Sequence, residues 1–280
     1  MLRAGLIQLN VGDDPGANLA HTLDLLRQAA GGGATLLLTP EATNILTPNR
    51  DRQRATLVPE DRDPTLASLR QAARDLGIWL SIGSLSLRHD DPAEDRFVNR
   101  GFLVAPDGGI AARYDKIHMF DVDISAGESF RESAAFRPGG RAVLAQGPVP
   151  MGLTICYDLR FPALYRRLAK AGAQVLAVPS AFHPQTGAAH WHVLLRARAI
   201  ETGCFVLAAA QTGIHPAPHS PGRKPRESYG HSLAVAPWGE VLADAGTAPG
   251  VTLVDLDMRR VDDARARVPA WRHDPVVWGP

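Results

Sequence analysis

The stretch 151–162 reads MGLTICYDLRFP, in which an apolar run passes directly into a polar turn. The run predicts a buried strand and the residues from Pro162 onward predict a helix, a succession typical of α/β folds. Cys156 stands at the junction, where strand backbone can hold a thiol rigidly at a sheet end that a substrate can reach. Buried cysteine is usually just a small hydrophobic residue, and Cys204, inside the apolar segment CFVLAAA, is interpreted that way. Cys156 therefore becomes a candidate nucleophile only if suitable partners exist elsewhere in the chain.

Two charged residues elsewhere in the chain are suitable partners for a thiol. Glu41 ends the apolar run 34–40, which is typical of a strand covered on both faces. Lys116 follows the strand-like segments 97–105 and 109–114. Taken singly, each would more often be a cap or a solvated charge. Together they supply what thiol chemistry needs, because a carboxylate can accept the thiol proton and an ammonium group favours the thiolate.

The motifs around these residues resemble the nitrilase superfamily of carbon-nitrogen hydrolases over nearly the whole chain. They read PEA at 40–42, YDKIH at 114–118 and CYDLRFP at 156–162. The resemblance implies an α/β fold with a four-layer α-β-β-α sandwich. It also implies a hydrolase acting on carbon-nitrogen bonds other than peptide bonds, in linear amides.

The resemblance implies a catalytic triad of Glu41, Lys116 and Cys156. In this scheme Glu41 is the general base, and the thiolate attacks the amide carbonyl to form a thioester. Lys116 and the backbone N–H of Tyr157 would form the oxyanion hole.

A further family position, a supporting Glu between the Lys and the Cys, maps onto Glu132. The sequence ES at 132–133 precedes FRPG at 136–139, as in the family. Glu128 is the competing residue, although it follows Ala-Gly in a predicted turn. Glu132 would orient Lys116 or the nitrogen of the substrate.

Three more motifs point to a branch of the superfamily: TGAAHW at 186–191, LLRARAIET at 194–202 and ESYGHS at 227–232. They resemble the branch that cleaves ω-amides of keto acids, and deaminated glutathione amidases more than ω-amidases. The expected reaction releases 2-oxoglutarate and Cys-Gly from deaminated glutathione. The alternatives are an ω-amidase acting on 2-oxoglutaramate, another aliphatic amidase, and, from another class, a cysteine N-acyltransferase. Tyr157-Asp158 argues against a nitrile hydrolase, in which Trp commonly follows the nucleophile.

The expected substrate, an α-keto acid amide, requires a group that binds its carboxylate. Arg160 lies four residues after the nucleophile, and a guanidinium can bind both oxygens of a carboxylate. A structural salt bridge with Asp158 or another acid is the alternative role. Phe182 and Thr186 could supply an apolar wall and a hydroxyl beside the keto group.

Histidines offer two rival mechanisms. A Cys156–His231 dyad requires only spatial proximity of the two side chains. His190 and His192 are two residues apart, unlike the i, i+4 pair of a helical zinc site, so no metal and no cofactor are expected. A non-enzymatic binding module would make the Glu, Lys and Cys motifs coincidental.

Composition excludes several classes of protein. The 280 residues are 45% hydrophobic and 21% charged, with a formal net charge of +1, so neither nucleic acid nor a membrane surface is an expected partner. Two cysteines offer no disulfide framework and indicate a reducing compartment, the cytoplasm. The N-terminus lacks the tripartite form of a signal peptide.

The pattern along the chain predicts a single domain, 1–280, in which strands alternate with helices. Loops are expected at 115–140 and 213–227, the second either a specificity loop or a surface insertion. The tail 268–280 carries Trp271 and Trp278 without a predicted element and is expected to pack on a partner subunit. The resemblance implies a homodimer or a higher homo-oligomer. Strands are predicted at 3–9, 35–39, 79–84, 97–105, 109–114, 143–146, 152–155, 174–179, 204–211, 232–236, 240–243 and 252–257, and helices at 18–30, 64–76, 162–171, 191–202 and 258–267.

Overall fold

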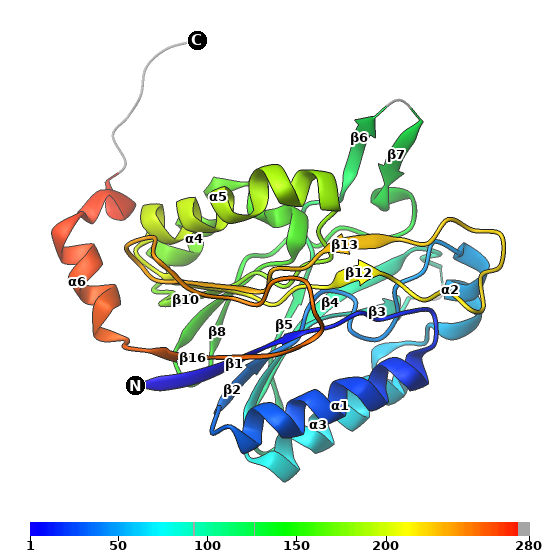
Figure 1. Cartoon of the computed structure of the whole chain (residues 1–280), viewed down its shortest axis with the longest axis horizontal. Coiled ribbons are helices and arrows are strands. Elements are labelled where there is room, and N and C mark those ends of the chain that lie inside the picture. Colours follow the sequence, from blue (N-terminus) through cyan, green and yellow to red (C-terminus); the bar gives the residue numbers. More distant parts are fainter. Residues whose placement is uncertain (92, 126, 274–280) are drawn as a thin grey trace.

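The computed structural model describes residues 1–91, 93–125 and 127–273 and has four layers (Figure 1). Two six-stranded sheets face each other. Helices α1 (Pro15–Gly31) and α3 (Pro64–Leu76) cover one sheet, and α4 (Pro162–Lys170) and α5 (Pro184–Thr202) cover the other. The predicted α-β-β-α sandwich is confirmed.

The first sheet has the order β16-β1-β2-β3-β4-β5. Strands β1, β2 and β3 are parallel, whereas β16, β4 and β5 pair antiparallel with their neighbours. The first and last strands of the chain are therefore partners, with Leu2 opposite Leu256. The bounds are β1 Leu2–Gln8, β2 Leu36–Leu38, β3 Trp79–Arg88, β4 Phe97–Val104, β5 Ile110–Asp115 and β16 Gly250–Leu256.

The second sheet repeats this plan in the order β15-β14-β11-β10-β9-β8. Strands β9, β10 and β11 are parallel, and antiparallel strands flank them on both sides. In each sheet the parallel strands end on the same edge, which is where α/β proteins place their sites. The bounds are β8 Val143–Gln146, β9 Pro150–Leu153, β10 Val175–Ala177, β11 Phe205–Ala208, β14 Leu233–Val235 and β15 Val241–Asp244.

Smaller elements fill the connections. The predicted loop 115–140 contains a hairpin of β6 (Asp121–Ser125) and β7 (Glu128–Arg131). The predicted loop 213–227 overlaps at its two ends with the paired strands β12 (Thr212–Ile214) and β13 (Glu227–Tyr229). In both cases the strands are short and carry polar residues, so the sequence has no clear apolar alternation there. The remaining helices are α2 (Arg50–Thr56), α6 (Arg259–Arg267) and the 3-10 turns η1 (Glu60–Arg62), η2 (Glu132–Ala134), η3 (Cys156–Arg160) and η4 (Pro269–Arg272).

Helix α3 shows why the sequence fixes some boundaries. The Asp63 side chain accepts a hydrogen bond of 2.7 Å from the N–H of Leu66, Pro64 opens the first turn, and Gly77 ends the helix at φ 64°. Both ends match the prediction. Helix α5 instead begins at Pro184, well before the predicted start at Trp191, because a proline in the first turn loses no intrahelical hydrogen bond.

The sheets approach each other closely at the edge where the parallel strands end. A Cβ atom added to Gly83, on β3, would lie 2.4 Å from the Pro179 Cβ atom, after β10, and 2.2 Å from the carbonyl oxygen of Thr39, after β2. Only glycine fits this position without movement of the backbone. The segments that follow β2 and β10 are thereby brought together.

The tail has some structure of its own, and its expected packing on a partner subunit stays a prediction. Residues 269–272 form η4, and Trp271 is partly buried against the core, with the Arg265 guanidinium 4.6 Å from its ring centroid. Trp271 thus packs on its own chain, and Trp278 lies outside the described residues.

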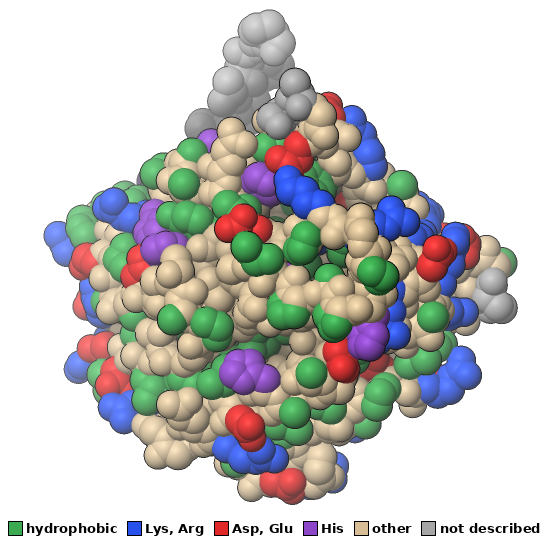
Figure 2. Space-filling view, turned by 45° about the vertical axis from the view of Figure 1, so that its right-hand side comes forward, with side chains coloured by type: hydrophobic (Ala, Val, Ile, Leu, Met, Phe, Trp, Pro, Cys, Tyr) green, Lys and Arg blue, Asp and Glu red, His purple; other side chains and the backbone are tan. Residues whose placement is uncertain are grey.

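The visible surface mixes basic and acidic side chains (Figure 2). Within the described residues no helix has both the length and the apolar character needed to cross a bilayer.

Candidate active site

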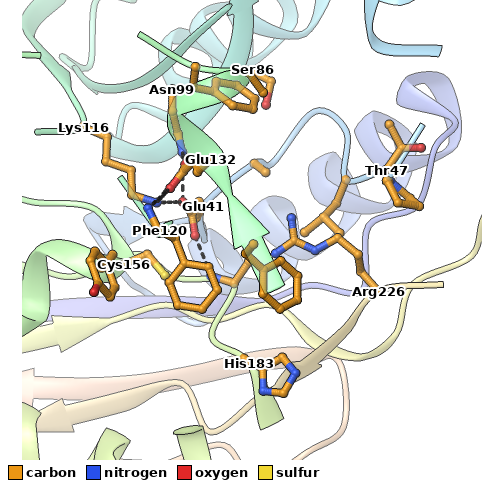
Figure 3. A pocket seen from close by; sticks show the side chains of 18 of the residues that line it. Glu41, Thr47, Ser86, Asn99, Lys116, Phe120, Glu132, Cys156, His183 and Arg226 are labelled. Carbon is orange, nitrogen blue, oxygen red and sulfur yellow. Dashed lines mark hydrogen bonds and ion pairs between the residues drawn. The ribbon is translucent and has the colours of Figure 1, made fainter. Parts of the chain in front are cut away.

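A cavity of about 250 Å³ lies where the parallel strands of the two sheets end (Figure 3). Its wall includes all but one of the side chains predicted from the sequence. Those in the wall are Glu41, Lys116, Glu132, Cys156, Tyr157, Phe182 and Thr186.

Cys156 begins the turn η3 at φ 49°, a left-handed conformation that a residue other than glycine adopts at a cost of roughly 1–3 kcal/mol. Its N–H donates to the Pro179 carbonyl oxygen at 2.8 Å, which holds the strained turn in place. The side chain is 6% exposed. The predicted junction between strand and helical turn is confirmed, and it presents the thiol to the cavity.

Glu41 follows β2 and is buried. Its Oε2 atom accepts a hydrogen bond from the N–H of Ala181 at 2.9 Å, and its Oε1 atom accepts one from Lys116 Nζ at 2.9 Å. Burial acts to raise the pKa of this carboxyl group, but the Lys116 charge and these hydrogen bonds outweigh it, so the pKa is lowered. A hydrogen bond with the Cys156 thiol acts in the same direction. Glu41 is therefore an ionised acceptor beside the thiol.

Lys116 follows β5 and is 2% exposed. Its Nζ atom lies 2.9 Å from Glu41 Oε1 and 2.9 Å from Glu132 Oε2. Burial acts to lower the pKa of the ammonium group, but the charges of Glu132 and Glu41 raise it well above its ordinary value. A fully buried cation is thus fixed by two carboxylates next to Cys156.

The pKa of the Cys156 thiol is raised by burial and by the Glu41 charge, against the opposing effect of Lys116. The resting pair is consequently a neutral thiol and a charged carboxylate. Such a pair can deliver a thiolate at the moment a substrate carbon approaches, with Glu41 taking the proton.

Glu132 occupies the position predicted for the supporting carboxylate. Its Oε2 atom also accepts a hydrogen bond from the N–H of Phe120 at 2.7 Å. Glu128 lies elsewhere, 3.7 Å from His183 Nε2 and 3.5 Å from Lys224 Nζ. The structure therefore brings Glu132, and not Glu128, to Lys116.

Asn99, on β4, joins this group without having been predicted. Its Nδ2 atom donates to Glu41 Oε1 at 2.9 Å and to Glu132 Oε1 at 3.4 Å. Its buried Oδ1 atom has no hydrogen-bond partner among the described residues. The available signal was an amide side chain within the apolar segment 97–105.

Asp158 ties two of the sequence motifs together. It accepts hydrogen bonds from Tyr114 Oη at 2.6 Å, from the N–H of Ile155 at 2.8 Å and from the N–H of His118 at 3.0 Å. The turn that carries Cys156 and the segment that carries Lys116 are thereby held at a fixed separation.

Arg160 is the predicted residue that does not line the cavity. Its guanidinium carbon lies 5.7 Å from the Tyr157 ring centroid and 5.3 Å from that of Phe182, and Nη1 lies 3.3 Å from His190 Nδ1. The structure shows no salt bridge with Asp158, since the Asp158 oxygens are engaged as described above. Arg160 thus lies over two rings that belong to the wall.

The rival dyad receives no support from the geometry. His231 is not part of the cavity wall, and its Nδ1 atom lies 2.9 Å from Asp244 Oδ1. His192 Nε2 lies 2.9 Å from Asp244 Oδ2, so that one ligand atom from each of these three residues lies within 4.8 Å of the others. Among the described residues, His192, His231 and Asp244 are therefore the group whose ligand atoms could hold a metal ion. None of the three lines the cavity.

Comparison with known proteins identifies relatives along the whole chain. Residues 3–266 match the family described as carbon-nitrogen hydrolase. The chain is 40% identical to a deaminated glutathione amidase of Mus musculus over 269 residues, 94% of this chain and 80% of the relative, and 36% identical to one of Yersinia enterocolitica, covering 97% and 92%.

Solved structures agree in fold. The NitFhit protein of C. elegans superposes with a TM-score of 0.86 at 35% identity, covering 98% of this chain and 65% of that one. A mutant amidase from Nesterenkonia sp. AN1, which shows Michael addition of acrylamide at its active site cysteine, has a TM-score of 0.77 at 29% identity, covering 96% and 98%.

Proposed function

The chain belongs to the carbon-nitrogen hydrolase family, and from this premise we propose that it is an amidase for deaminated glutathione, releasing 2-oxoglutarate and Cys-Gly. Two relatives with more than a third of their residues identical carry that activity in their names. The observation that carries the proposed chemistry is the buried contact of Glu41 and Lys116 beside the strained Cys156.

In the first half-reaction Glu41 takes the thiol proton while the Cys156 Sγ atom bonds to the amide carbon. Glu41 then gives this proton to the nitrogen, the C–N bond breaks, and the amine leaves a thioester behind. In the second half-reaction a water molecule attacks the thioester and gives a proton to Glu41. The C–S bond breaks, Glu41 returns its proton to the departing sulfur, the carboxylic acid leaves, and the thiol and the carboxylate are restored.

The negative charge that builds on the carbonyl oxygen is met by Lys116 Nζ and the N–H of Tyr157. One preorganised donor of this kind is worth roughly 3 kcal/mol of barrier. Lys116 is already held by Glu41 and Glu132, so it need not reorganise during the reaction. Glu132 orients Lys116 in this scheme.

The keto acid part of the substrate lies against Phe182 and Thr186, which both line the cavity. Arg160 lies over the Tyr157 and Phe182 rings, and in this proposal a change of its rotamer brings the guanidinium to the keto acid carboxylate. The Nesterenkonia amidase, whose active site cysteine reacts with acrylamide, supports the assignment of Cys156 as the nucleophile.

A substrate panel tests the proposal. Purified protein is incubated with deaminated glutathione, 2-oxoglutaramate, propionamide and an aliphatic nitrile, and each product is quantified. We expect the highest kcat/KM for deaminated glutathione. A higher value for 2-oxoglutaramate makes the protein an ω-amidase, and transfer of the acyl group to an added amine in preference to water makes it an acyltransferase.

Assembly and location complete the proposal. We expect a homodimer or a higher homo-oligomer that buries further helical surface, and a monomeric mass by light scattering at micromolar concentration would contradict this. Both cysteines are buried and unpaired, which supports a reducing compartment such as the cytoplasm.

A further inference from the structure

The cavity that contains Cys156 also contains cations far from the Glu41–Lys116 pair. Arg50, Arg131 and Arg226 line it, together with Thr47. In the view of Figure 3, Thr47 and Arg226 lie on one side of the cavity and Lys116 and Cys156 on the other. The proposed chemistry uses none of these arginines, so their presence needs a separate explanation.

Arg50 has an unsatisfied donor. Its guanidinium packs on the ring of Phe97, with 4.9 Å to the ring centroid, and Nη2 donates weakly to the Ala134 carbonyl oxygen at 3.4 Å. The Nη1 atom is buried and has no hydrogen-bond partner among the described residues. Leaving a charged donor desolvated and unpaired is unfavourable, unless a ligand supplies the missing acceptor.

Arg226 has no ion pair in the described part of the chain, and its guanidinium carbon lies 6.0 Å from the Phe130 ring centroid. It is nevertheless held by an ordered loop. Ser220 Oγ donates to Asp13 Oδ2 at 2.7 Å and lies 3.2 Å from Thr47 Oγ1, and the N–H of His215 donates to the Arg226 carbonyl oxygen at 2.9 Å. The loop is therefore anchored at the backbone of Arg226, while its guanidinium has no ion pair among the described residues.

Arg131 shows that a pocket arginine can be neutralised by the protein. Its Nη2 atom lies 2.8 Å from Asp123 Oδ1, and Nη1 donates to the carbonyl oxygens of Val122 and Phe130. Arg50 and Arg226 lack such partners in the same wall. The difference indicates that these two guanidinium groups, rather than all three, are kept free for an anion.

We propose that Arg50 and Arg226 form a carboxylate-binding subsite for the amine portion of the substrate, the portion that leaves first. The proposal rests on the proposed amidase function. Glu41 must face the leaving nitrogen, because it protonates it, and in Figure 3 Glu41 lies between Cys156 and Arg226. In this proposal a substituent on that nitrogen extends toward Arg50 and Arg226, and the acyl portion contacts Phe182 and Thr186. The substrate class is an N-substituted amide whose amine carries a carboxylate, as the C-terminal residue of a dipeptide does.

The test uses three substrates with one acyl group: deaminated glutathione, its C-terminal carboxamide, and 2-oxoglutaramate, whose leaving group is ammonia. The variants are Arg226→Gln and Arg50→Gln. Arg223→Gln, in the same loop, and Arg54→Gln, on α2 and paired with Asp95 at 3.2 Å, are matched controls outside the cavity wall. Binding of Cys-Gly and of Cys-Gly amide is measured in parallel by calorimetry.

We expect the wild type to prefer the carboxylate substrate over its carboxamide by roughly 10²-fold in kcat/KM, as for a site with half-buried charged donors that have no ion pair. Arg226→Gln and Arg50→Gln should remove most of this preference and leave kcat/KM for 2-oxoglutaramate within about threefold. The controls should retain the preference. If the variants lose as much kcat/KM for 2-oxoglutaramate as for deaminated glutathione, the proposal is overturned, since the arginines would then serve the acyl portion or the fold.

Two outcomes separate this proposal from the proposed function. If the wild type hydrolyses the acid and the carboxamide equally well, the amidase function stands and the subsite is refuted. If no substrate is hydrolysed, the amidase function fails, and the subsite is judged by calorimetry alone. If calorimetry shows that Cys-Gly binds no more tightly than Cys-Gly amide, the subsite is refuted in that case as well.

Discussion

The two ends of the cavity differ in how the protein satisfies its charges. At the inner end Glu41 and Lys116 are 6% and 2% exposed, and each charge has a partner within 3 Å. At the outer end Arg50 and Arg226 are half-buried and have no ion-pair partner among the described residues. The inner groups follow strands of the first sheet, whereas the outer ones lie on α2 and beside β13. In the proposed scheme the bond-making groups are thus preorganised by the protein, and the recognition groups are left for the substrate to complete.

The largest effect should follow from removal of the nucleophile at the inner end. Cys156→Ala should lower kcat by at least roughly 10⁴-fold, because the proposed acyl-enzyme forms on this thiol. Circular dichroism should show a folded protein, and chelators should leave wild-type activity unchanged. Retained turnover in Cys156→Ala would falsify the covalent mechanism.

Removal of the base should come next. Glu41→Gln should lower kcat by roughly 10³-fold, because no carboxylate remains to accept the thiol proton and burial, the largest cause of the raised pKa of the Cys156 thiol, persists. His231→Ala, outside the cavity wall, should keep its activity within a fewfold of wild type. The reverse result, an inactive His231→Ala with an active Glu41→Gln, would restore the cysteine-histidine dyad.

The same contrast separates what the sequence predicted from what it missed. Glu41, Lys116 and Cys156 each stand at the end of a strong apolar pattern, and sheet edges bring such strand ends together, so short motifs identified them. Arg50 and Arg226 lie on segments without periodicity, one on a short helix that the sequence did not predict. Their proximity depends on how α2 and the loop 213–227 pack, which no local pattern encodes. Asn99 lay within a predicted strand, but its role depends on contacts across the first sheet to Glu41 and Glu132.

Arg160 was predicted from the sequence, but it does not line the cavity. Its replacement should have a smaller effect than that of Cys156 or Glu41. Arg160→Ala should lower kcat/KM for keto acid amides by roughly 10–10²-fold and should change the value for propionamide much less. This difference is expected because only the keto acid presents a carboxylate. Equal losses on both substrates would make the contacts of Arg160 with Tyr157 and Phe182 structural.

His215, in the loop that carries Arg226, should have the smallest effect on catalysis but a measurable effect on stability. His215 is buried between the Val11 carbonyl oxygen and Ser228 Oγ, and burial lowers its pKa from 6.5 to about 4. The unfolded chain therefore binds a proton that the native protein excludes. Stability from this source is complete above about pH 6.5 and decreases by roughly 3 kcal/mol as the pH falls to about 4.

Thermal unfolding of wild type and His215→Gln between pH 7.5 and 4.5 measures this contribution. The wild-type Tm should fall more steeply than that of the variant, since glutamine does not titrate. Parallel curves would show that His215 is not held neutral in the native loop.

The pairing of β1 with β16 has a consequence for biosynthesis. Leu2 lies opposite Leu256, so β1 remains unpaired on one side until β16, which follows every other described strand along the chain, has been translated. Until then the polar backbone of β1 is unpaired on that side, and such an edge invites association between nascent chains. The arrangement also brings the start of the chain beside the end of its last strand (Figure 1). A circularly permuted gene that opens at an exposed loop would place β16, α6 and η4 shortly before β1, and comparison of its soluble yield with that of the natural order would show how far translation order limits folding.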